Sequence, residues 1–282
     1  MLQECIILAI KVYSNWFDKN HSVKVLPNQI IPQIKYSTLY APLRNFKNPL
    51  ISYKSYSTKS ESGNFCFNPW FITGLTDAEG TVSVRVNQTS RLRWRVALAF
   101  QIGLHKKDIE LLERVKAYFG DIGTIVSFSD MCAFSVSSPE QIFKKILPHF
   151  DKYPLISQKH IDYLLFKEIV EMMLRGEHLQ KDGLQTIVNI RASLNLGLSE
   201  VLKEAFPDTI PVTRSIKSSQ EIPNPEWVAG FTTGEGCFFV KITKGRNRVG
   251  IGAQIVFQVT QHIRDEELKF SYLFPMRPIL YN

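Results

Sequence analysis

The sequence predicts an α+β protein built as a tandem αββαββα repeat with pseudo-twofold symmetry, whose second copy is incomplete. Three observations lead to this fold class. A segment of apolar and small residues from Trp70 to Gly80 returns from Trp227 to Gly236, and both copies end in Glu-Gly. The pair Phe100-Gln101 returns as Phe257-Gln258 at nearly the same offset. Alternating apolar and polar residues follow each motif, as expected for half-buried antiparallel strands.

The first copy opens with a helix that Gly80 is expected to stop, because glycine commonly ends helices. A strand follows in which Val82, Val84 and Val86 share one face. A second strand places Trp94, Val96, Leu98 and Phe100 on one face and polar or small residues on the other. The apolar faces predict the core side of a sheet.

The remaining elements of this copy, and of the segment after it, are predicted from the spacing of apolar residues. They are an amphipathic helix over 107–119, strands over 124–128 and 132–136, a helix capped by Ser138 with Pro139 at its first position, and helices over 158–175 and 183–193.

The second copy supplies its opening helix and strands over 237–243 and about 251–260, and its match to the first copy is lost after about Leu268. We therefore expect a truncated or decaying form, with an open sheet edge that favours self-association. The expected division is a poorly ordered basic extension over 1–60, the first repeat with its following helices over 61–193, a linker over 194–224, a partial second repeat over 225–268 and a divergent tail over 269–282.

Composition excludes several classes of protein. The chain has 282 residues, 44% of them hydrophobic, so it can bury a core and is not wholly disordered. Most of the net charge of +8 lies in residues 1–60, so charge alone does not establish nucleic-acid binding by the folded part. Four scattered cysteines exclude a disulfide scaffold or a structural zinc site. The apolar run Cys5–Ile10 is far too short to span a membrane.

The two motifs and their flanks resemble the LAGLIDADG homing endonucleases, in particular the single-chain, two-motif type of fungal mitochondrial introns. The resemblance rests on Ile72–Gly80 and Val228–Gly236, and is supported by Phe100–Asp108, Pro148–Leu155, Gly183–Gly197 and Gly234–Val240. It covers about residues 65–268. It implies two saddle-shaped antiparallel sheets that lie in the major groove of DNA.

The chemistry of the motifs can also be argued from their residues. Small residues four apart, Gly74 with Ala78 and Gly230 with Gly234, would let two helices pack closely about a pseudo-twofold axis. That packing would bring the catalytic candidates Glu79 and Glu235 together, and two converging carboxylates need a cation. Mg²⁺, or another hard divalent cation with oxygen ligands, meets this need and can activate water for phosphodiester hydrolysis.

Asp77 and the repeated histidines His105 and His262 are not interpreted as catalytic. Asp77 has Thr233 as its counterpart, so we interpret it as structural or solvent-facing rather than catalytic. His105 returns as His262, but no closely spaced His or Cys accompanies them, so a histidine-based nuclease is not favoured. We expect both histidines to serve as caps or in packing.

The polar strand faces form the predicted DNA-binding surface. Arg and Gln can pair bidentately with guanine and adenine edges, whereas Lys mainly contacts phosphates. The residues are Ser83, Arg85, Asn87, Arg93, Arg95 and Gln101 in the first copy, and Lys241, Thr243, Lys244, Arg246, Arg248, Gln254 and Gln258 in the second.

The leading function is a site-specific, Mg²⁺-dependent double-strand DNA endonuclease acting at a long intron-insertion site, weakened or inactivated by truncation. The expected partner is double-stranded DNA, bound by a monomeric pseudo-dimer in the mitochondrion with no membrane association. Two alternatives stay open: an RNA maturase that binds its host intron RNA, and a non-cleaving DNA-binding relic. The resemblance also implies a basic residue near the active site, which the sequence does not identify.

Overall fold

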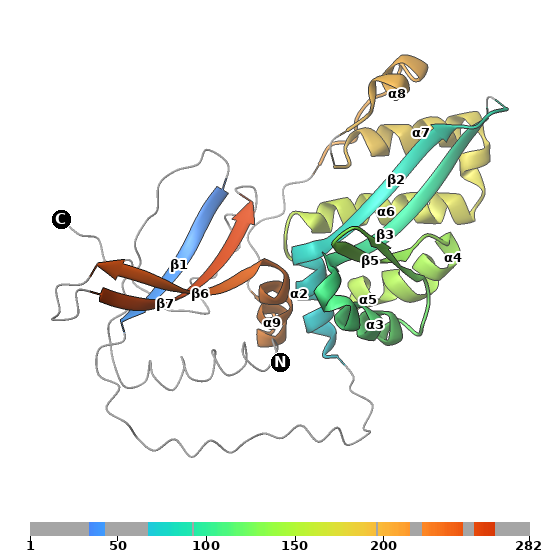
Figure 1. The fold of residues 1–282 in the computed structure, drawn as a ribbon. Coiled ribbons are helices and arrows are strands. Elements are labelled where there is room, and N and C mark those ends of the chain that lie inside the picture. The colour runs from blue at the N-terminus through green and yellow to red at the C-terminus, as the bar shows by residue number, and fades with distance from the viewer. Residues whose placement is uncertain are drawn as a thin grey trace. The chain divides into compact units, whose positions relative to one another are not determined.

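The computed structural model of the chain describes residues 34–42, 67–91, 93–195, 197–214, 222–244 and 251–262 (Figure 1). The described residues fall into two compact units. The larger unit runs from Asn68 to Gly234, and the smaller one contains residues 34–42 together with the strands that follow Glu235. Each unit has its own antiparallel sheet, which confirms the predicted class of mixed helices and antiparallel strands.

Helix α2 (Pro69–Glu79) carries the first motif. The side chain of Asn68 accepts a hydrogen bond from Trp70 N at 3.0 Å, and Pro69 lies in the first turn, which are usual signals of a helix start. Gly80 ends the helix in an extended rather than a left-handed conformation. Its role is steric, because a Cβ at Gly80 would lie 2.5 Å from the carbonyl oxygen of Thr76.

The larger unit contains a four-stranded antiparallel sheet in the order β2-β3-β5-β4. Its strands are β2 (Gly80–Gln88), β3 (Trp94–His105), β4 (Thr124–Phe128) and β5 (Met131–Val136). Val84, Leu98, Phe100 and Phe134 are buried on one face, and helices α2 and α3 (Ile109–Tyr118) contact the sheet. The alternation predicted for the first two strands is therefore confirmed.

The other helices of this unit lie close to their predicted positions. Ser138 accepts a hydrogen bond from Gln141 N at 3.3 Å and caps its helix as predicted. One helix was not predicted: α8 lies inside the segment 194–224 that we expected to be a linker. The elements are η1 (Lys106–Asp108), α4 (Pro139–Gln141), the π-helical turn η2 (Ile142–Ile146), α5 (Leu147–Lys152), α6 (Lys159–Leu174), η3 (Glu177–Leu179), α7 (Lys181–Ala192) and α8 (Glu200–Ala205).

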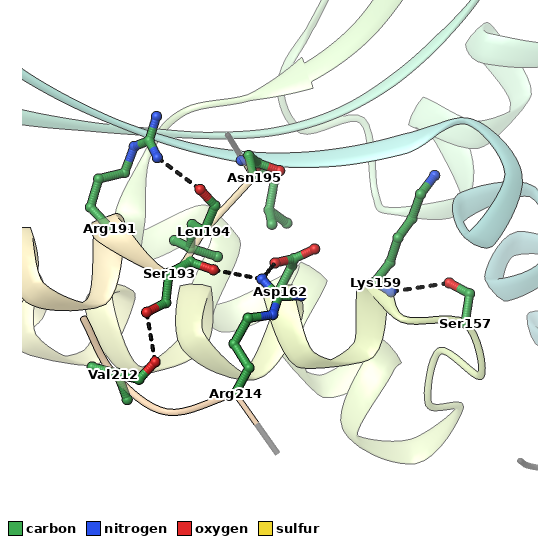
Figure 2. Close-up of polar contacts among 10 residues, drawn as sticks. Ser157, Lys159, Asp162, Arg191, Ser193, Leu194, Asn195, Val212 and Arg214 are labelled. Carbon is green, nitrogen blue, oxygen red and sulfur yellow. Dashed lines mark hydrogen bonds and ion pairs between the residues drawn. The ribbon is translucent and has the colours of Figure 1, made fainter. Parts of the chain in front are cut away.

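Side chains from the end of α7 cover the free edge of β2. Arg191 Nε donates to the carbonyl oxygen of Val84 at 2.7 Å, and Asn195 Nδ2 donates to that of Val82 at 3.0 Å. Figure 2 shows Arg191 and Asn195 beside the strands, with Arg191 also bonded to the carbonyl of Leu194. Because an unpaired strand edge invites pairing with another chain, these contacts protect the sheet.

The segment after α8 returns to the helical layer through one ion pair. Arg214 Nη1 lies 2.7 Å from Asp162 Oδ1 in α6 and also donates to the carbonyl oxygen of Ser193 (Figure 2). Asp162 is buried, whereas 34% of the Arg214 side chain is exposed. Part of the segment that we expected to be a linker is therefore bound to the first repeat through Arg214.

The smaller unit contains a three-stranded antiparallel sheet in the order β1-β7-β6. Strands β6 (Gly236–Lys244) and β7 (Ile251–His262) follow the second motif, as predicted. Strand β1 (Ile34–Pro42) lies within the extension 1–60 that we expect to be poorly ordered, and it pairs with β7. Within the described ranges, no helix is long and apolar enough to cross a membrane.

Candidate active site

The two motif helices, α2 and α9 (Pro225–Glu235), contact each other through their small residues. A Cβ at Gly74 would clash with the carbonyl oxygen of Trp227, and one at Gly230 would clash with that of Phe71. A Cβ at Gly234 would lie only 2.7 Å from that of Ala78. The two backbones therefore approach so closely that these positions of α2 and α9 require small side chains.

Glu79 is the last residue of α2 and is half-buried. Its side chain lies against α9, since a Cβ at Gly234 would be 2.6 Å from Glu79 Cγ. Burial raises the pKa of Glu79, and the nearby charge of Lys159 partly opposes this effect. Glu235 ends α9 in the same way, with Gly236 opening the next strand.

Lys159, the first residue of α6, was not predicted as part of this site. Its Nζ donates to the carbonyl oxygen of Ala78 at 2.7 Å and lies 3.5 Å from that of Thr76. A cation is favourable beside the terminal carbonyls of a helix, where the helix dipole is negative. Lys159 therefore stabilises the end of α2 directly beside Glu79, and no local sequence pattern could have indicated this.

Asp77 is buried and structural, so the solvent-facing half of our interpretation is wrong. Its carboxylate accepts hydrogen bonds from Ile156 N at 3.1 Å, Ser157 N at 3.2 Å and Ser157 Oγ at 2.5 Å. Trp227 Nε1 donates a fourth at 2.8 Å. Asp77 thus joins the loop before α6 to the second motif helix, and its oxygens are fully used.

The candidate site offers a hard divalent cation only a few carboxylate ligands. Among the described residues, no group of three or more His, Cys, Asp or Glu side chains could hold a metal. Since Asp77 is occupied, each motif helix offers one glutamate at its C-terminal end, Glu79 in α2 and Glu235 in α9. A cation held by so few carboxylates would complete its shell with water and phosphate oxygens, which suits Mg²⁺.

The polar face of β2 and β3 carries the predicted DNA-binding residues of the first copy. The ladder places Ser83 opposite Ala99, Arg85 opposite Ala97, and Asn87 opposite Arg95, so these residues share one face. Arg85, Asn87, Arg93 and Arg95 are exposed, Ser83 is partly buried, and Gln101 donates to Ser135 Oγ at 3.3 Å.

The second-copy candidates can be placed only by the register of their backbones. Lys241 lies opposite Gln254, Thr243 opposite Gly252, and Gln258 opposite Cys237, which gives one row of alternate positions. Lys244 lies opposite Ile251, at a position that alternates with that row, and its role in DNA binding stays a prediction. Arg246 and Arg248 lie outside the described residues.

His105 serves as a cap, as one of our interpretations predicts. Its Nδ1 accepts a hydrogen bond from Lys107 N at 3.1 Å at the start of η1. His262 is the last residue of β7 and lies opposite Ile34. Within the described residues, neither histidine belongs to a metal-binding cluster.

Comparison with known proteins identifies the family. The family model described as LAGLIDADG endonuclease matches residues 72–170 and 228–271, which include most of both motif helices. The chain belongs to the LAGLIDADG endonuclease family. Two relatives from Neurospora crassa are named Probable intron-encoded endonuclease 3 and Probable intron-encoded endonuclease 2. They are 38% identical over 198 residues and 40% identical over 212 residues. These matches cover 68% and 70% of this chain but 37% and 46% of the relatives, so the chain spans less than half their length.

The LAGLIDADG fold is also found by comparison with solved structures. The crystal structure of the I-SmaMI LAGLIDADG homing endonuclease bound to cleaved DNA is 44% identical, with a TM-score of 0.71. The match covers 73% of this chain and 70% of that chain. Another structure holds I-SmaMI bound to its uncleaved DNA target in the presence of calcium ions.

Proposed function

We propose that the chain acts as a site-specific double-strand DNA endonuclease that hydrolyses phosphodiester bonds with Mg²⁺. The observation that carries this proposal is the placement of Glu79. It is half-buried at the end of a helix packed backbone to backbone against the second motif helix, and its helix leads directly into a strand with an exposed polar face. The DNA-bound LAGLIDADG relative supports the same substrate.

In this mechanism Glu79 and Glu235 would each help to hold a divalent cation and serve the cleavage of one strand. The bound cation would lower the pKa of water for attack and stabilise the leaving oxygen. Lys159 holds the end of α2 in place, and Asp77 fixes α9 through Trp227. Arg85 and Arg95 of the strand face would contact base edges or phosphates and set the position of the duplex.

The intron-encoded relatives support a mitochondrial role for a gene carried in an intron. We propose that the long, partly symmetric target is the insertion site of that intron. The two sheets present different residues at corresponding positions, so the two half-sites would differ in sequence.

The test is cleavage of a supercoiled plasmid that carries the intron-insertion site. Linear product is expected with Mg²⁺ and none with EDTA. Glu79→Gln and Glu235→Gln are expected to abolish cleavage while retaining binding of the duplex in Ca²⁺. Glu113→Gln, on the exposed side of α3, is the matched control and should cut normally. Cleavage that survives Glu79→Gln would contradict the assigned role of this carboxylate.

A further inference from the structure

The hairpin formed by β4 and β5 exposes three large apolar side chains. Val126 is 56% exposed, Phe128 84% and Met131 51%. We refer to Val126, Phe128 and Met131 as the hairpin patch. Single exposed apolar residues are ordinary, but three at one hairpin require an explanation.

The register of the sheet puts the hairpin patch on the polar face, opposite the buried side chains. Phe128 lies opposite Met131, which lies opposite His105 of β3. In the next row of this face, Val126 lies opposite Ala133, which lies opposite Gly103. The alternate residues of β5, Cys132 and Phe134, are buried in the core. The hairpin patch is therefore continuous with the face that carries Gln101, Arg95 and Arg85.

The surroundings of the hairpin patch have small side chains and charges of both signs. Gly103 and Ala133 add little side-chain volume to the row that contains Val126. Lys106 and Lys107 are exposed at η1, and the backbone N–H of Lys106 donates to the carbonyl oxygen of Asp130 in the hairpin turn at 2.8 Å. Two exposed acids, Asp108 and Asp130, lie in the same region, so the local charge is mixed and apolar contact must contribute.

We propose that the hairpin patch reads thymine 5-methyl groups in the major groove and so selects thymines in the half-site bound by the first repeat. Thymine is the one base that presents a methyl group there, and apolar side chains recognise it by contact. This inference rests on the proposed function, because it requires that the same sheet face lie on a DNA duplex. It adds residues of β4 and β5 that the polar pattern of the sequence did not indicate.

The experiment removes only the methyl group. The full chain is used to select binders in Ca²⁺ from a duplex pool randomised at its centre, and the most enriched duplex is taken as the probe. Each thymine is then replaced in turn by deoxyuridine, and Kd is measured for the native chain, Phe128→Ser and Val126→Ser. Burying one methyl group contributes about 0.8 kcal/mol, so uracil at a contacted position should weaken native binding about fourfold.

The variants decide whether the hairpin patch is responsible. In Phe128→Ser or Val126→Ser the uracil effect should disappear at the contacted thymines and remain unchanged elsewhere. Ser127→Ala, an exposed change on the opposite face of β4, is the control and should keep the full effect. Because Phe128 is 84% exposed, its loss should leave the thermal midpoint unchanged.

The two possible failures are distinguishable. If the pool yields no enriched sequence, the proposed function fails and this inference fails with it. If a sequence is enriched but uracil has no effect, or has the same effect in both variants, the hairpin patch does not read thymine although the chain binds DNA.

Discussion

His149 makes the stability of the larger unit sensitive to mild acid. The ring is 8% exposed in α5 and touches the first motif helix through Thr73. Thr73 Oγ1 donates its proton to the carbonyl oxygen of Tyr153 at 2.9 Å, so it accepts from His149 Nε2 at 3.2 Å. His149 Nδ1 then accepts from the hydroxyl of Tyr118 at 3.0 Å, which assigns the neutral tautomer from the hydrogen-bond network.

Burial lowers the pKa of His149 from 6.5 to about 4, which sets the direction of the effect. Above about pH 6.5 the ring is neutral in both the folded and the unfolded chain, and its titration does not change stability. As the pH falls further, His149 becomes protonated in the unfolded chain but not in the folded chain. The stability of the folded chain therefore decreases until about pH 4. The loss is about 2 kcal/mol at about pH 5 and approaches about 3 kcal/mol at its limit.

Urea unfolding of the native chain, His149→Gln and Tyr118→Phe, at about pH 7.5 and about pH 5, measures this contribution. His149→Gln is expected to be less stable at neutral pH, because it loses the Tyr118 hydrogen bond, but to lose about 2 kcal/mol less than the native chain on acidification. Tyr118→Phe keeps the titrating ring and should retain the native pH dependence. Equal losses in the native chain and His149→Gln would refute the reasoning.

Three further changes have defined outcomes. In Asp77→Asn an amide N–H₂ group replaces one carboxylate oxygen and faces two of the four buried donors that Asp77 accepts from. The free energy of unfolding should therefore fall by about 2–4 kcal/mol, measured by urea titration. Gly230→Val drives a side chain into the carbonyl of Phe71 and should lower stability by at least about 2 kcal/mol, whereas Val228→Ile at a buried neighbouring site should cost less. Arg191→Met leaves the Val84 carbonyl unpaired at a strand edge, so stability should fall by about 1 kcal/mol and light scattering should detect association.

The elements that the sequence predicts well are those with strong local periodicity. The strands β2 and β3 alternate with period two, and α3 buries Leu112 and Val115 on one face, so their positions follow from the pattern. Helix α8 was missed because it has six residues and a single buried side chain, Leu202. Strand β1 was missed because its pairing with β7 joins residues more than two hundred positions apart, and no local signal specifies such a contact.

Some features of the candidate site can likewise be predicted from local sequence patterns, whereas others depend on tertiary contacts. The small residues at Gly74 and Gly230 are visible as a repeat, because both helices need them for one close contact. The role of Lys159 depends on a hydrogen bond to Ala78, 81 positions away, and only the folded chain reveals it. The position of β4 and β5 residues on the same face as Gln101 likewise depends on the order of the strands in the sheet. Alternation of apolar and polar residues within one strand does not determine that order.

The contrast between Asp77 and Thr233 argues that the glutamates are the functional acids. Asp77 accepts from four donors, three of them in the loop before α6 and one in the second motif helix. Thr233, its counterpart, donates to the carbonyl oxygen of Ala229 within its own helix at 2.8 Å. An acid that only one motif possesses, and whose oxygens are already used, cannot supply matched ligands for cleavage of two strands. Glu79 and Glu235 occupy the same helix end in the two motifs, which supports the proposal that they, and not Asp77, hold the cations.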